Sequence, residues 1–257
     1  MLISRKNVIR GLYPDEVDEE LAYKIGIFLG KKFKKIVVGS DMRSSSPELK
    51  RFLLKGLLES KITIIDVGVL PTPLIHFCLS KYKIEAGVAV TGSSSPKDYH
   101  GFKFLGKASV DLKDVKKIKG TGNDLGDILP QNVEDDYTKV VLSKIKAKKN
   151  ARVVLDAGNG VAGMIAVKLF QKAGFDVLPL HCEPDLSFPN RSPDLSDLLQ
   201  LKKKIAEKSA HVGIAYDGDG CKFAILDKNG KAVSVKNETG DAIYDSLKAA
   251  EIFSQRI

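Results

Sequence analysis

Hydrophobic positions along this chain switch repeatedly between a helical and a strand-like spacing. Val17, Leu21, Ile25 and Phe28 share one helical face, and the short apolar run at residues 36–38 is typical of a buried strand. The same patterns predict further helices over residues 45–53, 73–80, 133–141, 161–172, 195–208 and from 240, and further strands over residues 62–67, 86–90, 152–156, 175–180, 212–215 and 223–226. Strands that alternate with helices favour a mainly parallel sheet covered by helices.

Turn and cap residues mark where these elements begin and where the chain divides. Ser45 and Glu48 have the spacing of a capping box for the helix that follows. Residues 121–132 carry two glycines and a proline among polar residues, which is typical of a domain boundary. We therefore expect an α/β protein of two consecutive three-layer α/β/α domains with mixed, mainly parallel sheets, at residues 1–132 and 133–239.

A single helix is expected in the last segment, residues 240–257. One helix cannot bury its apolar face alone, so this segment either packs on the second domain or begins a third.

Composition and charge narrow the classes of function. The chain has 257 residues, 43% of them hydrophobic, and a net charge of +9 from dispersed lysines. The lysine runs lack interleaved aromatic residues and any nucleic-acid motif, so we interpret them as solvated helix faces and expect no nucleic-acid partner. Residues 1–13 are broken by charges, and no apolar run reaches membrane-spanning length, so we expect no secretory signal and no membrane partner. Three widely spaced cysteines fit no zinc motif and suit a reducing compartment, with the cytoplasm as the default.

A loop of small polar residues follows the strand predicted at 86–90. Its sequence, TGSSSPKDYHGFK over residues 91–103, places Ser93 beyond the carboxyl end of that strand, where ligand sites lie in such sheets. A serine hydroxyl needs a base or a charge field to act as a nucleophile, and a loop rich in Gly and Ser offers donors to phosphate oxygens. The loop therefore indicates phosphoryl chemistry at Ser93, and the alternative is an ordinary turn.

A second loop, YDGDGCK over residues 216–222, follows the apolar run at 212–215. Asp217 and Asp219 are separated by a glycine, and the glycines let the backbone curl around an ion. This pattern suits a hard cation with oxygen ligands, Mg²⁺ before Ca²⁺. An EF-hand is excluded because the further acidic positions of that loop are missing. The alternative is a tight turn between two strands.

Together the two loops resemble those of the α-D-phosphohexomutases, the phosphomannomutase/phosphoglucomutase family. In that family the serine loop reads T-[AG]-S-H-N-P with a later N-G-x-K, and the metal loop reads D-G-D-G-D-R. Further segments agree with the family in order and spacing: residues 9–11 (IRG), 39–43 (GSDMR), 66–73 (DVGVLPTP), 156–163 (DAGNGVAG) and 188–190 (FPN). The resemblance covers most of the chain.

The resemblance implies a mechanism and a set of site residues. A phosphoserine aligned with Ser93 would give its phosphoryl group to a hexose phosphate such as mannose or glucose 6-phosphate. The hexose 1,6-bisphosphate formed, which is also the family's activator, would return its other phosphoryl group to the serine. Mg²⁺ held by the serine phosphate, Asp217 and Asp219 would neutralise charge on the transferring group. Lys103 matches a lysine that exchanges a proton with the sugar hydroxyl, and Arg10 matches an arginine near the phosphoserine.

The chain departs from the family pattern in both loops. Ser94 and Ser95 replace the His and Asn that follow the serine, so the assisting imidazole is missing. His100 replaces the later Asn; it is a candidate phosphate contact if it folds back, but we expect an exposed loop histidine without a chemical role. Cys221 stands where the third metal aspartate belongs, and a neutral, soft thiol is poorly matched to Mg²⁺, so we expect weakened metal affinity. Lys222 replaces an arginine and keeps a charge for substrate or phosphate.

Length is the largest departure from the family pattern. Family members have four domains, and the resemblance here covers the first two, with residues 240–257 similar to the start of the third. We therefore expect a truncated chain that lacks the loop recognising the sugar hydroxyls and the loop binding the non-reacting phosphate of the substrate. Such a chain is expected to convert its substrate inefficiently when alone. Three hypotheses follow: an active phosphohexomutase half that needs a second chain supplying domains three and four, a degraded remnant without turnover, and a non-catalytic module that binds phosphate or a partner. For Arg43 we expect a structural ion pair.

Overall fold

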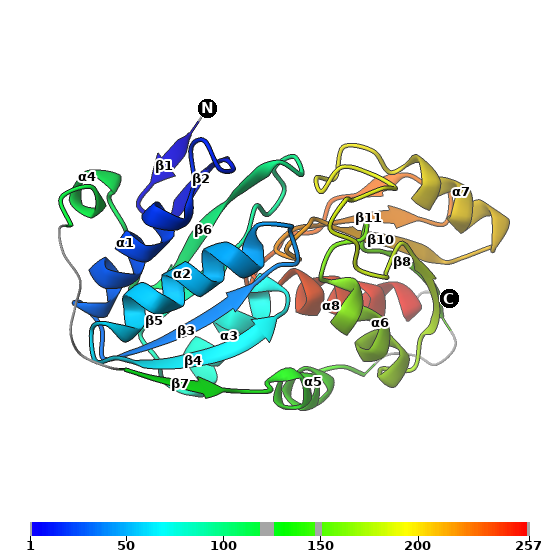
Figure 1. The fold of residues 1–257 in the computed structure, drawn as a ribbon. Helices are drawn as coiled ribbons and strands as arrows, with labels where there is room; N and C mark the ends of the chain where they lie inside the picture. Colours follow the sequence, from blue (N-terminus) through cyan, green and yellow to red (C-terminus); the bar gives the residue numbers. More distant parts are fainter. Residues whose placement is uncertain (1, 119–125, 147–150, 256–257) are drawn as a thin grey trace. The chain divides into compact units, whose positions relative to one another are not determined.

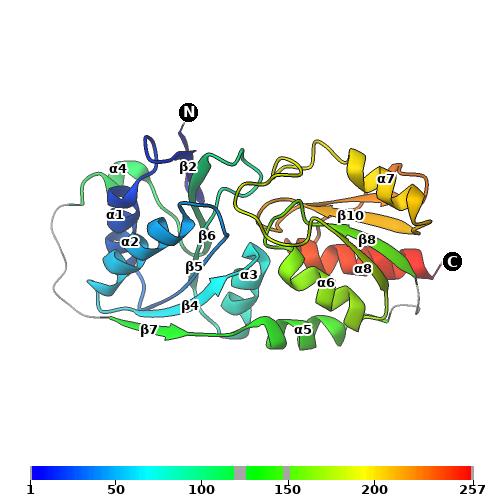
Figure 2. The ribbon, with the colours of Figure 1, turned by 45° about the vertical axis from the view of Figure 1, so that its right-hand side comes forward.

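Two mixed sheets organise the chain in the computed structural model, which describes residues 2–118, 126–146 and 151–255 (Figure 1). The first structural unit comprises residues 1–92 and 97–133, and the second comprises residues 93–96 and 134–257. Each unit has helices on both faces of its sheet (Figures 1 and 2). The predicted α/β/α architecture with mixed sheets is therefore confirmed.

The first unit follows the β-α-β order that the hydrophobic pattern predicts. Its elements in chain order are β1 (Ile3–Arg5), β2 (Val8–Leu12), α1 (Glu19–Gly30), β3 (Lys35–Ser40), α2 (Ser46–Leu58), β4 (Thr63–Val69), α3 (Thr72–Lys81), β5 (Ala86–Val90), β6 (Tyr99–Gly106), α4 (Leu112–Val115) and β7 (Asp127–Pro130).

The strands of this sheet lie in the order β1-β2-β6-β5-β3-β4-β7. Strands β5, β3, β4 and β7 are parallel neighbours, whereas β1, β2 and β6 join antiparallel. α1 and α2 cover one face, and α3 covers the other (Figures 1 and 2). Residues 127–130 of the boundary region predicted at 121–132 form strand β7, which pairs with β4. Residues 121–125 of that prediction lie outside the described residues.

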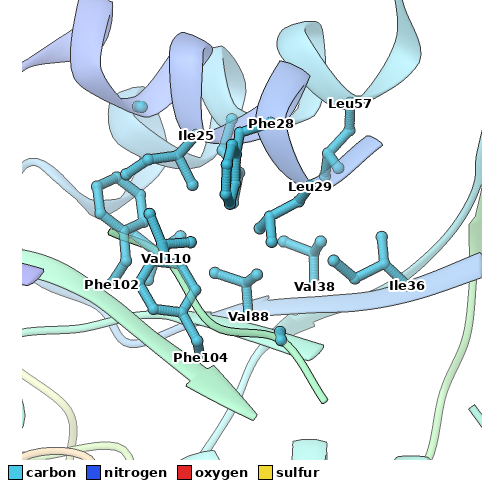
Figure 3. Close-up of a cluster of buried hydrophobic side chains, with 14 of the residues drawn as sticks. Ile25, Phe28, Leu29, Ile36, Val38, Leu57, Val88, Phe102, Phe104 and Val110 are labelled. Carbon is cyan, nitrogen blue, oxygen red and sulfur yellow. The ribbon is translucent and has the colours of Figure 1, made fainter. Parts of the chain in front are cut away.

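The core of the first unit lies between the α1 and α2 layer and the sheet. Figure 3 shows this cluster, with side chains from α1, α2, β3, β5, β6 and the segment after β6 pointing into one space: Ile25, Phe28, Leu29, Ile36, Val38, Leu57, Val88, Phe102, Phe104 and Val110. Of the helical face predicted from Val17, Leu21, Ile25 and Phe28, the last two are buried in α1 and Val17 is buried just before it, whereas Leu21 is partly buried against the same cluster. α1 begins after Asp18, whose side chain accepts a hydrogen bond from the Leu21 amide at 2.8 Å.

α1 and α2 pack closely because glycines face each other at their contact. A Cβ atom on Gly56 would lie 2.1 Å from the carbonyl oxygen of Tyr23, and one on Gly26 would lie 2.3 Å from that of Leu53. α2 begins where the sequence predicts, but the capping box is wrong. Ser45 makes no side-chain cap bond, and its hydroxyl pairs instead with His100.

The second unit repeats the α/β pattern around its own sheet. Its elements in chain order are α5 (Glu134–Leu142), β8 (Arg152–Asp156), α6 (Gly163–Lys172), β9 (Asp176–Leu180), α7 (Leu199–Glu207), β10 (Val212–Tyr216), β11 (Phe223–Asp227), β12 (Ala232–Val233) and α8 (Ala242–Ser254). The strand order is β12-β11-β10-β8-β9, with β10, β8 and β9 parallel and β11 and β12 antiparallel.

Helices α6 and α8 lie on one face of this sheet and α7 on the other (Figures 1 and 2). α8 packs on β10 and β11, with Ile243 and Leu247 fully buried. Residues 240–257, which resemble the start of a third domain, thus group with the second unit. Within the three described ranges, no helix has the length and apolar character needed to cross a membrane.

Candidate functional site

Asp41 organises the start of the serine loop within the first unit. It follows β3 and is only 3% exposed. Its Oδ2 accepts hydrogen bonds from the Thr91 hydroxyl at 2.7 Å and from the Gly92 amide at 3.1 Å. Its Oδ1 accepts from the Ser46 hydroxyl at 2.6 Å. The carboxylate therefore ties the start of α2 to the residues that lead into Ser93.

Arg43 packs beneath the same loop and holds the ion pair expected for it. Its Nε lies 3.4 Å from Asp41 Oδ2, and its Nη1 donates to the carbonyl oxygen of Tyr99 at 2.8 Å. A Cβ atom on Gly92 would come within 2.3 Å of the Arg43 Cζ atom. The glycine of the TGSSSP sequence is thus required by the close approach of a buried guanidinium group.

Ser93 and the two aspartates of the second loop meet within the second unit, with which residues 93–96 group. The Ser93 hydroxyl donates to Asp219 Oδ1 at 2.9 Å and lies 3.4 Å from Asp217 Oδ2. Ser93 is 4% exposed and both aspartates are fully buried. The serine backbone has φ of 49°, in the left-handed region that few non-glycine residues adopt. Residues that are 124 and 126 positions apart in the chain thus come together.

The donor set at this point consists of oxygen atoms. Two carboxylates and a hydroxyl converge, which fits a hard cation such as Mg²⁺. The backbone already shapes the loop, because the Lys222 amide donates to Asp217 Oδ1 at 2.9 Å and the Cys221 amide lies 3.4 Å from Asp219 Oδ1. Among the described residues, no group of three or more His, Cys, Asp or Glu side chains is arranged to hold an ion. Cys221 as a third ligand stays a prediction.

Lys222 lies beside the serine loop. Its Nζ donates to the Ser94 hydroxyl at 3.1 Å, next to Ser93 in the chain. The ammonium group is therefore near the hydroxyl that would carry phosphate. Its role as a phosphate contact stays a prediction.

Arg10 and Lys103 belong to neighbouring strands of the first unit. Arg10 on β2 pairs with Gly101 on β6, two residues before Lys103. Both side chains lie on the face opposite Ile9 and Phe102, which belong to the hydrophobic core cluster of the first unit. The sheet thus places the two cations on one face, and their roles with phosphoserine and sugar stay predictions.

His100 corrects one expectation. It is not an exposed loop residue, because it lies in β6, is 4% exposed and pairs through Nδ1 with the Ser45 hydroxyl. Burial, with the nearby positive charge of Arg43, lowers the pKa of His100 to about 4. The imidazole is therefore neutral at physiological pH and supports the start of α2 rather than an exposed loop.

Arg191 was not predicted from the sequence, and it contacts the end of β10, which leads into the loop of Asp217 and Asp219. Its side chain is 4% exposed, and its Nη2 donates to the carbonyl oxygen of Tyr216 at 2.6 Å. Tyr216 ends β10 and directly precedes Asp217. The available signal was a charged residue directly after the FPN segment in a proline-rich loop.

Two family models match this chain, each over a different part of its length. Residues 2–123 match the model described as Phosphoglucomutase/phosphomannomutase, alpha/beta/alpha domain I, and residues 134–230 match the model for alpha/beta/alpha domain II. The chain belongs to the phosphoglucomutase/phosphomannomutase family. The family resemblance of its loops is thereby confirmed.

Individual relatives match this chain over most of its length. A phosphomannomutase/phosphoglucomutase of Pseudomonas syringae pathovar tomato is 35% identical, and the match covers 90% of this chain and 53% of that protein. A phosphoglucomutase of Neisseria meningitidis serogroup B is 32% identical over 88% of this chain and 53% of its own length. A solved phosphoglucomutase/phosphomannomutase family protein from Burkholderia thailandensis has a TM-score of 0.82 at 30% identity, covering 89% of this chain and 55% of that one. The chain spans about half the length of the curated relatives it matches.

Proposed function

We propose that this chain carries out the phosphoserine-based phosphoryl transfer of a phosphohexomutase on hexose phosphates, with mannose and glucose phosphates as the first substrates to test. One observation supports the proposal above all. The Ser93 hydroxyl lies 2.9 Å from Asp219 and 3.4 Å from Asp217, so the proposed phosphoryl acceptor and the carboxylates proposed to bind the metal lie side by side at one buried point. Phosphoryl transfer depends mainly on such positioning and on charge neutralisation.

The residues present fit Mg²⁺, which would be held by Asp217, Asp219 and the oxygen on Ser93. When bound, the ion supplies charge neutralisation on the transferring phosphoryl group. Ser93 Oγ would form the new P–O bond while the bond between phosphorus and the sugar oxygen breaks. The Ser93 hydroxyl proton would leave toward Asp219, and the sugar oxygen would take a proton from Lys103. The ammonium of Lys222, which contacts Ser94, is placed to bind phosphate oxygens. Lys103 and Arg10 keep their proposed roles in proton exchange with the sugar and in phosphoserine binding.

Phosphorylation of Ser93 is the direct test, because it needs only the first half of the reaction. The full chain is incubated with glucose 1,6-bisphosphate and Mg²⁺, and its intact mass is measured before and after. We expect one added phosphoryl group, mapped to Ser93 by peptide sequencing, and none on Ser93→Ala. Ser94→Ala is the matched control and should still be phosphorylated. A chain that gains no phosphate, or gains it elsewhere, contradicts the proposal.

Turnover is proposed to be slow in this chain alone. Ser94 replaces the family histidine that assists the serine. Cys221 replaces the third metal aspartate of the family, which removes a negative charge from the proposed metal site. Conversion of glucose or mannose 6-phosphate to the 1-phosphate should therefore lie far below ordinary mutase rates.

A second candidate function is binding of sugar phosphate without turnover. The feature that favours it is Cys221, which stands where the family resemblance implies a third metal aspartate, because a thiol is poorly matched to Mg²⁺. Calorimetric binding of glucose 6-phosphate with no phosphate gain on Ser93 would select this function. Phosphorylated Ser93 would exclude it.

A further inference from the structure

We propose that Arg191 is the residue that positions the metal loop, by fixing the end of β10 from which Asp217 and Asp219 extend. The part of this proposal that concerns ion binding rests on the proposed function. The structural part does not, because it concerns how the loop at residues 217–222 is held in the protein without any ligand.

The contacts of Arg191 reach three parts of the second unit. Its Nε donates to Asp156 Oδ2 at 3.1 Å, at the end of β8. Its Nη2 donates to the carbonyl oxygen of Tyr216 at 2.6 Å, at the end of β10. Its Nη1 donates to the carbonyl oxygen of Asp194 at 2.6 Å, within its own loop. One buried guanidinium group therefore links the carboxyl ends of two parallel strands to the proline-rich loop.

The loop that carries Arg191 also contacts the metal loop directly. The Gly218 amide donates to the carbonyl oxygen of Pro193 at 2.9 Å. Gly218 lies between the two aspartates in the chain, so this bond and the Arg191–Tyr216 bond hold Asp217 from both sides. The metal loop also closes on itself, because the Asp217 amide donates to the carbonyl oxygen of Lys222 at 3.1 Å.

Glycine at position 158 makes room for the guanidinium group. Gly158 has φ of +52°, and a Cβ atom there would lie 2.5 Å from the Arg191 Cζ atom. The Gly158 amide donates to Asp156 Oδ1 at 2.8 Å, so the same carboxylate holds both the glycine turn and the arginine. The site is thus shaped around a planar group with several donors, which a lysine ammonium cannot replace.

The first unit contains the same arrangement beneath its own functional loop. There, Arg43 pairs with Asp41, donates to the carbonyl oxygen of Tyr99 and packs against Gly92. In both units an aspartate after or at the end of a central strand, a buried arginine and a glycine of the loop form one cluster. The same kind of cluster thus supports each of the two loops that bring Ser93, Asp217 and Asp219 together, which supports a positioning role for Arg191.

The test compares the variants Arg191→Met and Arg191→Lys with a control variant of Arg152. Arg191 contacts the carboxyl end of β8, and Arg152 lies at the other end of that strand. Arg152 begins β8, pairs with Asp176 at 2.7 Å and donates to the carbonyl oxygen of Lys208, but its side chain is 42% exposed. Arg152→Met therefore removes an arginine–aspartate pair from β8 without touching the metal loop. Hydrogen–deuterium exchange is measured by mass spectrometry on the full chain, at a temperature where circular dichroism shows every variant folded.

We expect Arg191→Met to raise exchange in peptides covering residues 212–222 at least tenfold, with smaller changes elsewhere in the unit. Arg191→Lys should give an intermediate increase, and Arg152→Met should leave those peptides unchanged. If the Met variant does not fold, the Lys variant decides alone. A variant that lowers the unfolding midpoint but raises exchange evenly over the second unit would overturn the proposal, because that pattern describes a residue supporting only global stability.

A Mn²⁺ titration followed by electron paramagnetic resonance separates the proposed function, which needs a metal site, from the proposed positioning role of Arg191. If the wild-type chain binds the ion, we expect at least tenfold weaker binding by Arg191→Met and unchanged binding by Arg152→Met. Equal affinity in the wild-type chain and the Met variant would overturn the positioning role. If the wild-type chain binds no Mn²⁺, the metal part of the proposed function fails, and the exchange data still decide the role of Arg191.

Discussion

Replacing Asp41 by Asn tests whether the buried cluster beneath the serine loop stabilises the first unit. The substitution keeps the size of the side chain but removes its charge and one of its two acceptor oxygens. Oδ1 accepts from the Arg43 amide at 3.0 Å and from Ser46 at 2.6 Å, while Oδ2 accepts from Thr91 at 2.7 Å and Gly92 at 3.1 Å. Either orientation of the Asn amide group therefore turns its NH₂ toward a backbone N–H group, which cannot accept, and toward a hydroxyl that would have to rotate to accept.

The magnitude follows from these contacts and from the buried guanidinium group. Hydrogen bonds to a charged group are each worth about 1.5–3 kcal/mol, and breaking a buried ion pair costs about 3–5 kcal/mol. The two effects overlap, because Arg43, 1% exposed, takes part in both. We therefore expect Asp41→Asn to lower the free energy of unfolding by about 4 kcal/mol, a large fraction of the roughly 5–15 kcal/mol typical of a domain.

Urea unfolding followed by far-UV circular dichroism at neutral pH measures this difference. Asp114→Asn is the control, since Asp114 pairs with Lys117 at 3.2 Å on the surface, with 53% of its side chain exposed. The control should stay within about 0.5 kcal/mol of the wild-type chain. An Asp41→Asn variant that unfolds within about 1 kcal/mol of the wild-type chain would refute the assigned role of this carboxylate.

Three further changes test other parts of the molecule. The pKa of His100 is lowered from 6.5 to about 4 in the folded chain. Between these two pH values the unfolded chain therefore binds a proton on His100 that the folded chain does not. Stability should thus be complete above about pH 6.5 and fall by about 2–3 kcal/mol as the pH drops toward 4. Urea titrations should show that the free energy of unfolding falls less over this pH range in His100→Gln than in the wild-type chain. An identical fall would contradict the role given to His100. Gly56→Ala should destabilise the chain by about 1–2 kcal/mol despite the better helix propensity of alanine, because the added Cβ meets the Tyr23 carbonyl oxygen; a raised melting temperature would disprove the tight contact. Cys221→Asp should strengthen Mg²⁺ binding at least tenfold in a calorimetric titration if position 221 faces the ion, and unchanged affinity would show that it does not.

Elements with a strong local pattern could be predicted from the sequence. The buried face of α1 follows from apolar residues at helical spacing, and β5 and β8 follow from short apolar runs before glycine-containing loops. The partnership of Ser93 with Asp217 and Asp219 was also accessible, because each loop follows a central strand and the family resemblance links the two. These features depend on residues close in the chain or on motifs that carry their own chemistry.

Features that depend on distant side chains could not be predicted in this way. Ser45 has the spacing of a helix cap, yet its hydroxyl pairs with His100, 55 residues later, and nothing local indicates that choice. Arg191 stands in a polar loop where a charged residue would ordinarily be solvated, and only the folded unit brings Asp156 and the Tyr216 carbonyl oxygen to it. In both cases tertiary contacts decide between local alternatives of similar stability.

Strand β7 has a practical consequence for anyone who wishes to produce the first unit alone. It supplies the hydrogen-bonding partner of β4 after a polar stretch that looks like an inter-domain linker. A fragment that ends at residue 120 lacks β7, so the backbone amides and carbonyls on that edge of β4 would have no hydrogen-bond partner. Val69, at the end of β4, is already 44% exposed. Such a fragment should precipitate on expression, whereas one carried on through Val133 keeps its outermost strand and should remain monodisperse.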